Sequence, residues 1–195
     1  MSHFDLTILV IDENAVRAAI IEDGLREAGH SHVTVIHTVN GIARVIETTR
    51  PDVIIIDIEN PNRDMMEHLF QLTRSVSRPI AMFVDRSDSA SIEAAVEAGV
   101  SAYIVDGLRK ERVKPILDMA VIRFNAFSRL QRELAEAKSA LEDRKVVERA
   151  KGILMKLRNL SEEEAYALLR QTAMNEKKKL ADIAQSVVTA AGLLM

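Results

Sequence analysis

Apolar residues in the first 120 positions occur in short runs that alternate with longer amphipathic stretches. Five runs have the length and the β-branched content of buried strands, and the stretch after each has helical spacing of its apolar positions. The runs are 6–12, 32–37, 52–57, 79–84 and 101–105, and the stretches are 14–29, 40–49, 65–76, 89–99 and a helix from about 112. This alternation predicts an α/β fold, a doubly wound five-stranded parallel sheet covered by helices on both faces.

The fifth predicted helix continues well beyond the length that the sheet needs. It contains no Gly from Val113 through Leu141, and Pro115 falls in its first turn, where a missing N–H costs little. Apolar residues recur at heptad spacing at Ala120, Phe127, Leu134 and Leu141, interleaved with Ile116, Leu130 and Ala137. The pattern predicts a coiled-coil seam over 113–143 and a homodimer formed through it. The alternative is an amphipathic helix that folds back on its own chain.

Three helical stretches make up the C-terminal part. The first is the tail of the long helix, to about Leu157, and the third lies around 180–191. The second begins at Ser161, because Ser161 and Glu164 have the spacing of a capping box. A small three-helix all-α module is expected. The predicted domains are 5–122, the overlapping coiled-coil helix 113–143, and 144–195.

Composition and charge exclude several classes of protein for this chain. The chain has 195 residues and no cysteine, which excludes disulfides, thiolate metal sites and cysteine nucleophiles. No run of about 18 apolar residues occurs, so a cytoplasmic protein is expected. The net charge is −3, but from Arg144 onward ten Lys and Arg face six Asp and Glu, so the C-terminal part is basic and the rest is acidic. That asymmetry favours a nucleic-acid contact in the C-terminal part.

Carboxylates follow two of the predicted strands. Asp57 ends the apolar run 53–56, and Asp12 and Glu13 end the first run. Because the carboxyl ends of parallel strands meet at one edge of the sheet, these acids are expected to share a pocket with Mg²⁺, with Asp57 as a candidate phosphoryl acceptor. The alternative for Asp57 is a solvated acid in the turn before Asn60 and Pro61.

The stretches "ILVIDEN" and "VIIIDIENP" resemble the first and third strands of bacterial response regulator receiver domains (CheY-like), over about residues 5–122. The resemblance implies that Asp12 and Glu13 hold the metal and that Asp57 accepts the phosphoryl group. Two positions depart from the family pattern. Val84 stands where a switch Ser or Thr is expected, and Asp106 stands where the family has Lys. We therefore expect a metal-binding or purely structural pocket rather than productive phosphorylation.

The helix after Arg144 has an apolar face and a basic remainder. Val146, Ala150, Ile153, Leu154 and Leu157 form the apolar face, and the basic residues are Arg144, Lys145, Arg149, Lys151, Lys156 and Arg158. A helix surface rich in cations attracts a phosphate backbone. Gly152 interrupts this helix at a cost of about 1 kcal/mol relative to Ala. Its presence indicates either close helix packing or close approach of a ligand backbone.

The segments "RKVVERAKGILM", "LSEEEAYALLRQTAM" and "LADIAQSVV", within Leu141–Val188, resemble the ANTAR module, the RNA-binding output domain of bacterial transcription antiterminators. The resemblance implies recognition of paired stem-loops in leader RNA, whose formation competes with a terminator hairpin. The RNA contacts that it implies are Lys151, Tyr166 and Arg170, with Arg144, Arg149 and Lys156 on the RNA backbone. Alternatives remain a half-buried core ring for Tyr166 and a solvated loop for Lys177–Lys179.

The stretches "ENPNRDMMEHLFQ", "PIAMFVDRSD" and "GVSAYIVDGL" are similar to the antiterminator subgroup that controls nitrate and nitrite assimilation in proteobacteria. This similarity implies a nitrate-sensing partner that resembles a solute-binding protein and sequesters the regulator. Two other functions need features that this sequence lacks. A DNA-binding response regulator would need a recognition helix richer in base-reading side chains. A phosphatase using Asp57 would need a hydroxyl or cation near the pocket, so a non-enzymatic protein is expected.

Overall fold

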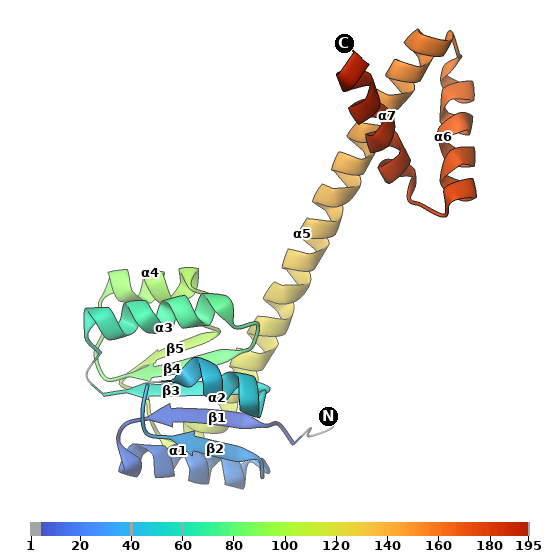
Figure 1. Cartoon of the computed structure of the whole chain (residues 1–195). Coiled ribbons are helices and arrows are strands. Elements are labelled where there is room, and N and C mark those ends of the chain that lie inside the picture. The colour runs from blue at the N-terminus through green and yellow to red at the C-terminus, as the bar shows by residue number, and fades with distance from the viewer. Residues whose placement is uncertain (1–4, 40, 60, 195) are drawn as a thin grey trace. The chain divides into compact units, whose positions relative to one another are not determined.

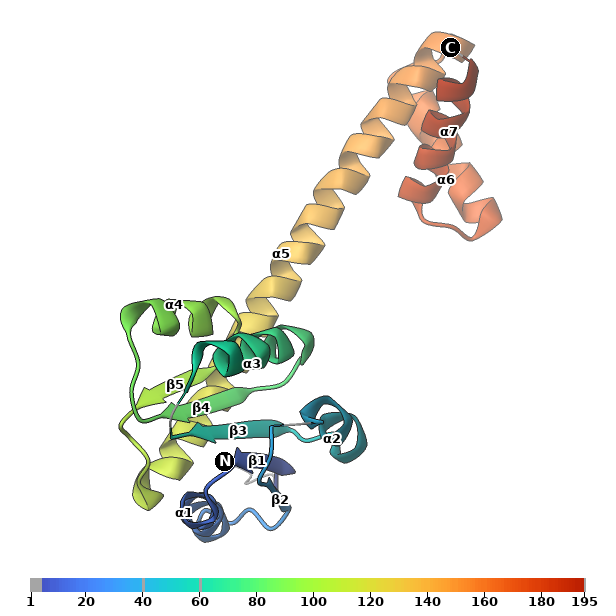
Figure 2. The same ribbon diagram turned by 60° about the vertical axis from the view of Figure 1, so that its left-hand side comes forward.

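The computed structural model describes residues 5–39, 41–59 and 61–194 and divides into two compact units, 1–128 and 129–195 (Figures 1 and 2). The start of the second predicted helix at residue 40 lies outside the described residues. None of the described helices is both long enough and apolar enough to cross a membrane.

The first unit contains a five-stranded parallel sheet in the order β2-β1-β3-β4-β5, which confirms the predicted fold class. The strands are β1 (Ile8–Asp12), β2 (Val33–Ile36), β3 (Val53–Ile58), β4 (Ile80–Val84) and β5 (Ala102–Val105). Every residue of β1, β3 and β4 is buried, as expected for the central strands of a sheet covered on both faces.

Helices cover both faces of this sheet. They are α1 (Ala15–Glu27), α2 (Ile42–Thr49), α3 (Arg63–Ser75), α4 (Ser89–Glu97) and the first part of α5 (Lys110–Arg158). Helices α2, α3 and α4 lie on one face of the sheet and α1 and α5 on the other (Figure 2). The side chains of each group form a core cluster with alternate residues of the strands. The side-chain alternation of the strands thus supplies two apolar layers from one sheet.

The extent of the predicted seam needs a correction. Ile116 and Ala120 are 7% and 0% exposed, and both belong to the core that α5 forms with the sheet. By contrast Phe127, Leu130, Leu134 and Leu141 are 54–59% exposed. The heptad spacing therefore serves two different surfaces: its first members pack on the sheet, and the unpartnered seam begins at Phe127.

The second unit packs the end of α5 with α6 (Glu162–Glu176) and α7 (Leu180–Leu194). The predicted capping box is confirmed: the Ser161 hydroxyl accepts from the Glu164 backbone N–H, and the Glu164 carboxylate accepts from the Ser161 backbone N–H. The core includes four buried alanines, Ala150, Ala165, Ala173 and Ala184, beside larger aliphatic residues. Small side chains let the three helices approach closely.

Candidate functional site

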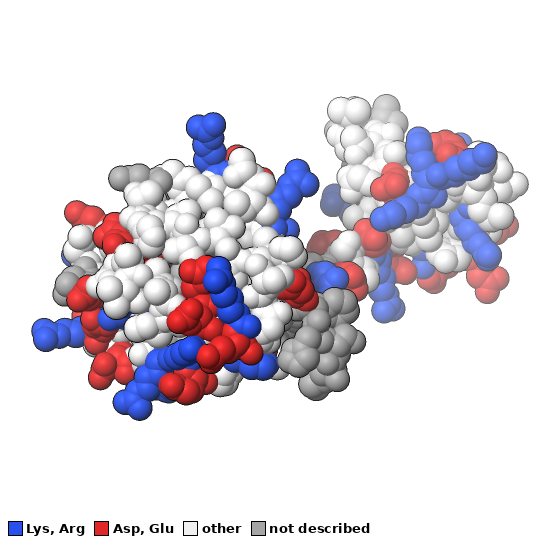
Figure 3. Space-filling view, turned by 90° about the horizontal axis from the view of Figure 1, so that it is seen from below, with Lys and Arg blue, Asp and Glu red and all other residues white. Residues whose placement is uncertain are grey.

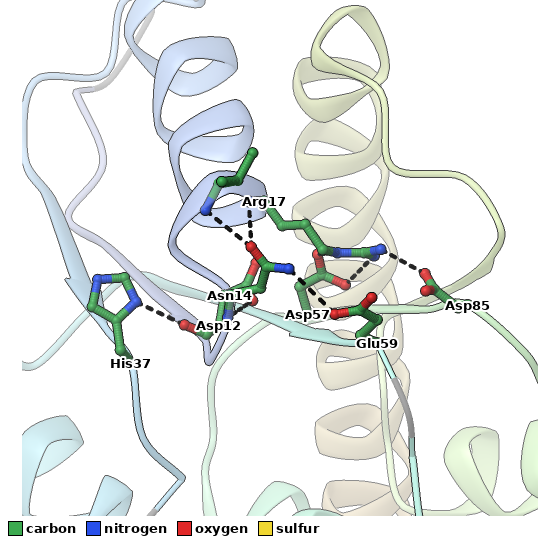
Figure 4. Close-up of polar contacts among 8 residues, drawn as sticks. Asp12, Asn14, Arg17, His37, Asp57, Glu59 and Asp85 are labelled. Carbon is green, nitrogen blue, oxygen red and sulfur yellow. Dashed lines mark hydrogen bonds and ion pairs between the residues drawn. The ribbon is translucent and has the colours of Figure 1, made fainter.

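Two carboxylates face each other at the carboxyl edge of the sheet. Asp12 ends β1, Asp57 lies near the end of β3, and the two residues are directly paired in the parallel register. Both are almost completely buried, at 3% and 4% exposure. The sequence prediction that these acids share one pocket agrees with this pairing. Figure 4 shows the pocket with the polar side chains around it.

A guanidinium group pairs with one of the two carboxylates in this pocket. Arg17 Nε donates to Asp57 Oδ2 at 2.7 Å and Arg17 Nη2 donates to Asp57 Oδ1 at 2.8 Å. A third donor, Arg17 Nη1, reaches Asp85 Oδ1 in the loop after β4 at 2.7 Å (Figure 4). The bidentate hydrogen bonds to Asp57 raise the pKa of Arg17 further above its usual range, and the bond to Asp85 adds to this effect.

Asp12 is the carboxylate that this arginine does not satisfy. Its Oδ1 accepts the backbone N–H of Asn14 at 2.8 Å, whereas its Oδ2 is buried without a hydrogen-bond partner. Burial is the main cause that raises the pKa of Asp12 to about 7, and the neighbouring charge of Asp57 raises it further. Asp12 is thus about half protonated near neutral pH.

The predicted metal site is not assembled in this arrangement. Receiver domains generally bind Mg²⁺ in this acidic pocket, but here both oxygens of Asp57 are engaged by Arg17 and Glu13 is exposed. The described residues contain no group of three His, Asp or Glu side chains that could hold a metal ion. The donor set Asp12, Glu13 and Asp57 therefore does not fit a divalent cation, because the chain supplies a cation of its own.

The two positions that depart from the family pattern lie at the carboxyl ends of β4 and β5. Val84 ends β4 and is 1% exposed, so it contributes to the core rather than to a polar contact. Asp106 follows β5 with a φ of 48° and is exposed. Neither position offers a hydroxyl or a cation that could hold a phosphoryl oxygen, so the expectation that this pocket does not switch by ordinary phosphorylation stays a prediction.

Sequence reasoning missed Arg17 and Asp85. One signal was available for the arginine: Arg17 is the third residue of α1 after the cap Asn14, in the first turn. The amino end of a helix favours acids and disfavours cations. A cation placed there, one turn after the acids that end β1, indicates a local anionic partner. Asp85 carried no comparable signal, because only the fold brings it to Arg17.

The second candidate site is the basic surface of the second unit. Figure 3 shows Lys and Arg side chains gathered on the visible face of this unit, with Asp and Glu side chains around them. Arg144, Arg149, Lys156, Arg158 and Arg170 are all exposed. Within the part of the chain that the structure describes, none of these five side chains forms an ion pair. They are therefore free to meet an anionic ligand.

Lys151 differs from these cations, and the structure argues against its predicted contact with RNA. It is 7% exposed, and its ammonium donates to both carboxylate oxygens of Glu148 at 3.0 Å and to Glu162 Oε1 at 2.6 Å. The bonds to Glu162 and then Glu148 raise the pKa of Lys151, and the bond to Lys151 lowers the pKa of Glu162. Lys151 thus ties α5 to the amino end of α6.

Tyr166 and Arg170 lie four residues apart on α6 and share one exposed face of that helix. Tyr166 is 43% exposed and Met174, about two turns further along, is 70% exposed. The tyrosine ring is outside the buried core cluster of the unit. An exposed ring beside an unpaired arginine is an arrangement that can stack on an unpaired base and hold the adjoining phosphate.

Each of the two units is matched by a model of a known protein family. The model described as "Response regulator receiver domain" matches residues 8–118, and the model described as "ANTAR domain" matches residues 135–188. Among solved structures, the signal receiver domain of a modulated diguanylate cyclase from Desulfovibrio desulfuricans has 18% identity and a TM-score of 0.53. That alignment covers 62% of this chain and 97% of the other, and it shows the receiver fold.

Two curated proteins extend the comparison. The chain is 28% identical over 185 residues to the transcriptional regulatory protein PdtaR of Mycobacterium tuberculosis, covering 95% of this chain and 90% of that one. It is 34% identical over 80 residues to the nitrate regulatory protein of Klebsiella oxytoca, covering 41% of this chain and 20% of that one. With a receiver model over more than half of its length and an ANTAR model over its second unit, the chain belongs to the response regulators with an ANTAR domain.

Proposed function

We propose that this protein is an RNA-binding transcription antiterminator. Its second unit binds leader RNA that contains two stem-loops, and the bound RNA cannot refold into the terminator hairpin. One observation carries the proposal. The ANTAR unit has exposed cations that form no ion pair among the described residues, and an exposed ring at Tyr166. These cations include Arg149, Lys156 and Arg170. Free cations supply backbone affinity, and an exposed ring suits unstacked loop bases.

Recognition of two stem-loops fits two copies of the chain. The exposed apolar residues Phe127, Leu130, Leu134 and Leu141 form a surface on α5, the exposed seam, that a second α5 would cover. One ANTAR unit from each copy would then bind one stem-loop. Linking two sites raises the apparent affinity for a paired target through effective concentration. A homodimer formed through the exposed seam is therefore part of the proposal.

Control of the protein would come from a protein contact rather than from phosphorylation. The ion pairs of Arg17 with Asp57 and Asp85 occupy the acceptor carboxylate, and Val84 replaces the switch hydroxyl. We propose that a nitrate-sensing protein that resembles a solute-binding protein sequesters this chain, and that the regulated genes serve nitrate and nitrite assimilation. The partial match to a nitrate regulatory protein supports this assignment.

The test is a binding series with the purified full-length protein. The probe is the two-stem-loop leader RNA of the transcription unit next to the gene of this protein, and the competitors are a scrambled RNA and a DNA duplex. We expect tighter binding to the leader RNA at every salt concentration, with log K falling linearly against log[salt]. Equal affinity for all three nucleic acids would contradict the antiterminator function, and preference for the duplex would favour a DNA-binding regulator.

A cellular readout tests the control. Asp57→Asn keeps an oxygen acceptor for Arg17 but cannot accept a phosphoryl group. Nitrate-dependent read-through of a terminator reporter should survive this substitution. Loss of the nitrate response, with normal protein abundance, would show that control requires phosphorylation of Asp57.

A further inference from the structure

Gly152 occupies an unfavourable position in α5. It lies inside a continuous helix, six residues before the helix ends at Arg158. Gly in a helix interior costs about 1 kcal/mol relative to Ala. The residue therefore needs a compensating role, and close helix packing and close approach of a ligand are the two physical reasons available.

Packing does not explain this glycine. A Cβ atom placed on Gly152 would meet no atom within 4 Å. The buried residues Ala150 and Leu154 precede and follow it by two positions, about 200° around the helix, so Gly152 lies opposite the packed face of α5. Gly24 shows the contrast within the same chain, because a Cβ there would lie 2.9 Å from the carbonyl oxygen of Lys110.

Cations flank the bare helix backbone at Gly152. Arg149 lies three residues before it and Lys156 four residues after it, so both side chains border the same face. Both are exposed, and neither has an ion-pair partner among the described residues. The nearest acid on this face, Glu148, is bound through both oxygens to Lys151. The charge around the open space at the Cβ position of Gly152 is therefore positive.

We propose that Gly152, Arg149 and Lys156 form a cradle for the sugar-phosphate backbone of a single RNA strand, and this inference rests on the proposed RNA-binding function. The missing side chain lets a phosphate approach the helix surface. Arg149 offers a planar fork of donors to one phosphate, and Lys156 offers a point charge to a neighbouring one. Contacts of this kind set the position of the RNA and carry no sequence preference of their own.

A second copy of α5 is the competing occupant, because the exposed seam lies on the same side of the helix as Gly152. The heptad positions after Leu141 argue against it. They fall on Arg144 and Glu148 instead of apolar residues, so the apolar seam stops before the glycine. A symmetric pairing would also bring Arg149 and Lys156 of one copy close to the same cations of the other, which costs energy. Charge complementarity thus favours a polyanion.

The experiment compares full-length Gly152→Ala and Gly152→Leu with Gly192→Ala. Gly192 is an exposed glycine in α7 with open space at its Cβ position, so its substitution controls for the gain in helix propensity. The probe is the same two-stem-loop leader RNA. We expect Gly152→Ala to weaken binding about threefold and Gly152→Leu about tenfold or more, while Gly192→Ala stays within about twofold. Circular dichroism should show no loss of helix in any of the three.

The outcomes distinguish a failure of the RNA-binding function from a failure of the cradle at Gly152. If the unsubstituted protein has no preference for the leader RNA, the RNA-binding function itself is wrong. If it prefers the RNA and Gly152→Leu binds as tightly, only the cradle is overturned. Sedimentation of the same samples gives the third comparison: loss of the dimer together with loss of RNA binding in Gly152→Leu would assign the glycine to a protein interface and overturn the cradle.

Discussion

Arg17 donates to both carboxylate oxygens of Asp57, so the candidate phosphoryl acceptor is held by a cation from its own chain. The contact joins the first turn of α1 to the end of β3, two elements that the parallel sheet brings together. The Asp57 side chain is fully buried and that of Arg17 is 19% exposed. A buried carboxylate with a bidentate partner depends strongly on that partner.

Replacing Arg17 with Ala should lower the free energy of unfolding of the receiver by roughly 3 kcal/mol, because Asp57 would remain buried without its partner. The same substitution should raise the affinity for Mg²⁺ above that of the unsubstituted protein, because it removes the cation that holds both oxygens of Asp57. Urea titration measures the first effect and isothermal titration calorimetry the second.

Arg26→Ala is the matched control for the Arg17 prediction. Arg26 lies on the same helix in an exposed pair with Glu22, so its loss should change stability by less than about 1 kcal/mol and should create no metal affinity. Magnesium binding to the unsubstituted protein, at an affinity equal to that of Arg17→Ala, would show that Arg17 does not occupy the cation position.

Asp12 predicts how stability depends on pH. Its pKa is about 7 in the folded protein against an ordinary value of 3.8 for an aspartate, so between these values the folded state binds more protons than the unfolded state. Stability should therefore fall as pH rises from about 4 to about 7, by up to about 1.4 kcal/mol per pH unit from this group. Asp12→Asn keeps the acceptor for the Asn14 N–H and removes the titration.

The difference between the two proteins isolates the effect of Asp12 from that of every other titrating group. The difference in unfolding midpoint between Asp12→Asn and the unsubstituted protein should change between about pH 4 and 7 and stay constant outside that range. Parallel curves for Asp12→Asn and the unsubstituted protein would mean that Asp12 is ionised throughout this range.

The exposed seam predicts self-association. Leu134→Lys places a charge in the middle of the seam and should shift a dimer to monomer in sedimentation equilibrium, because a buried unpaired cation on each copy costs several kcal/mol. Ser139→Lys introduces the same side chain on the same helix, away from the seam positions, and should leave the dimer intact. Identical molecular masses for the two variants would exclude the seam as the interface.

Lys151 predicts a loss of stability without a direct loss of RNA contact. Lys151→Met keeps most of the apolar stem but removes the bonds to Glu148 and Glu162, so the thermal midpoint of the second unit should fall by a few degrees. RNA affinity at a temperature where both proteins are folded should change by less than about threefold. Arg149→Ala is the comparison: it should weaken binding and reduce the slope against log[salt] by about 1.

An RNA affinity that collapses in a fully folded Lys151→Met protein would restore the original assignment of Lys151 as a contact. Circular dichroism at the assay temperature establishes which case applies.

The sheet was predictable because uninterrupted apolar runs such as Val53–Ile56 have few alternatives in an α/β chain, and alternation of elements constrains their pairing. The capping box at Ser161 was equally local, since both partners lie within four residues. These features depend on neighbours in the sequence. They need no knowledge of which distant side chains meet.

The rest depended on contacts across the fold. Arg17 meets Asp85 from 68 positions away, and the pattern of the chain does not contain that contact. Heptad spacing cannot tell which surface a seam faces, so Ile116 and Phe127 looked equivalent although only the first is buried. Lys151 was counted with the exposed cations, because charge alone does not reveal two glutamates that enclose it.

The exposed part of the seam, from Phe127 to Leu141, spans only about two heptads. So short an apolar contact would make self-association reversible at cellular concentrations, because the apolar area that it buries is limited. The abundance of the protein would then set the fraction in the paired form by mass action. A partner that binds the monomer need not contact the RNA-binding surface. Removing free monomers is enough to shift the equilibrium away from the dimer.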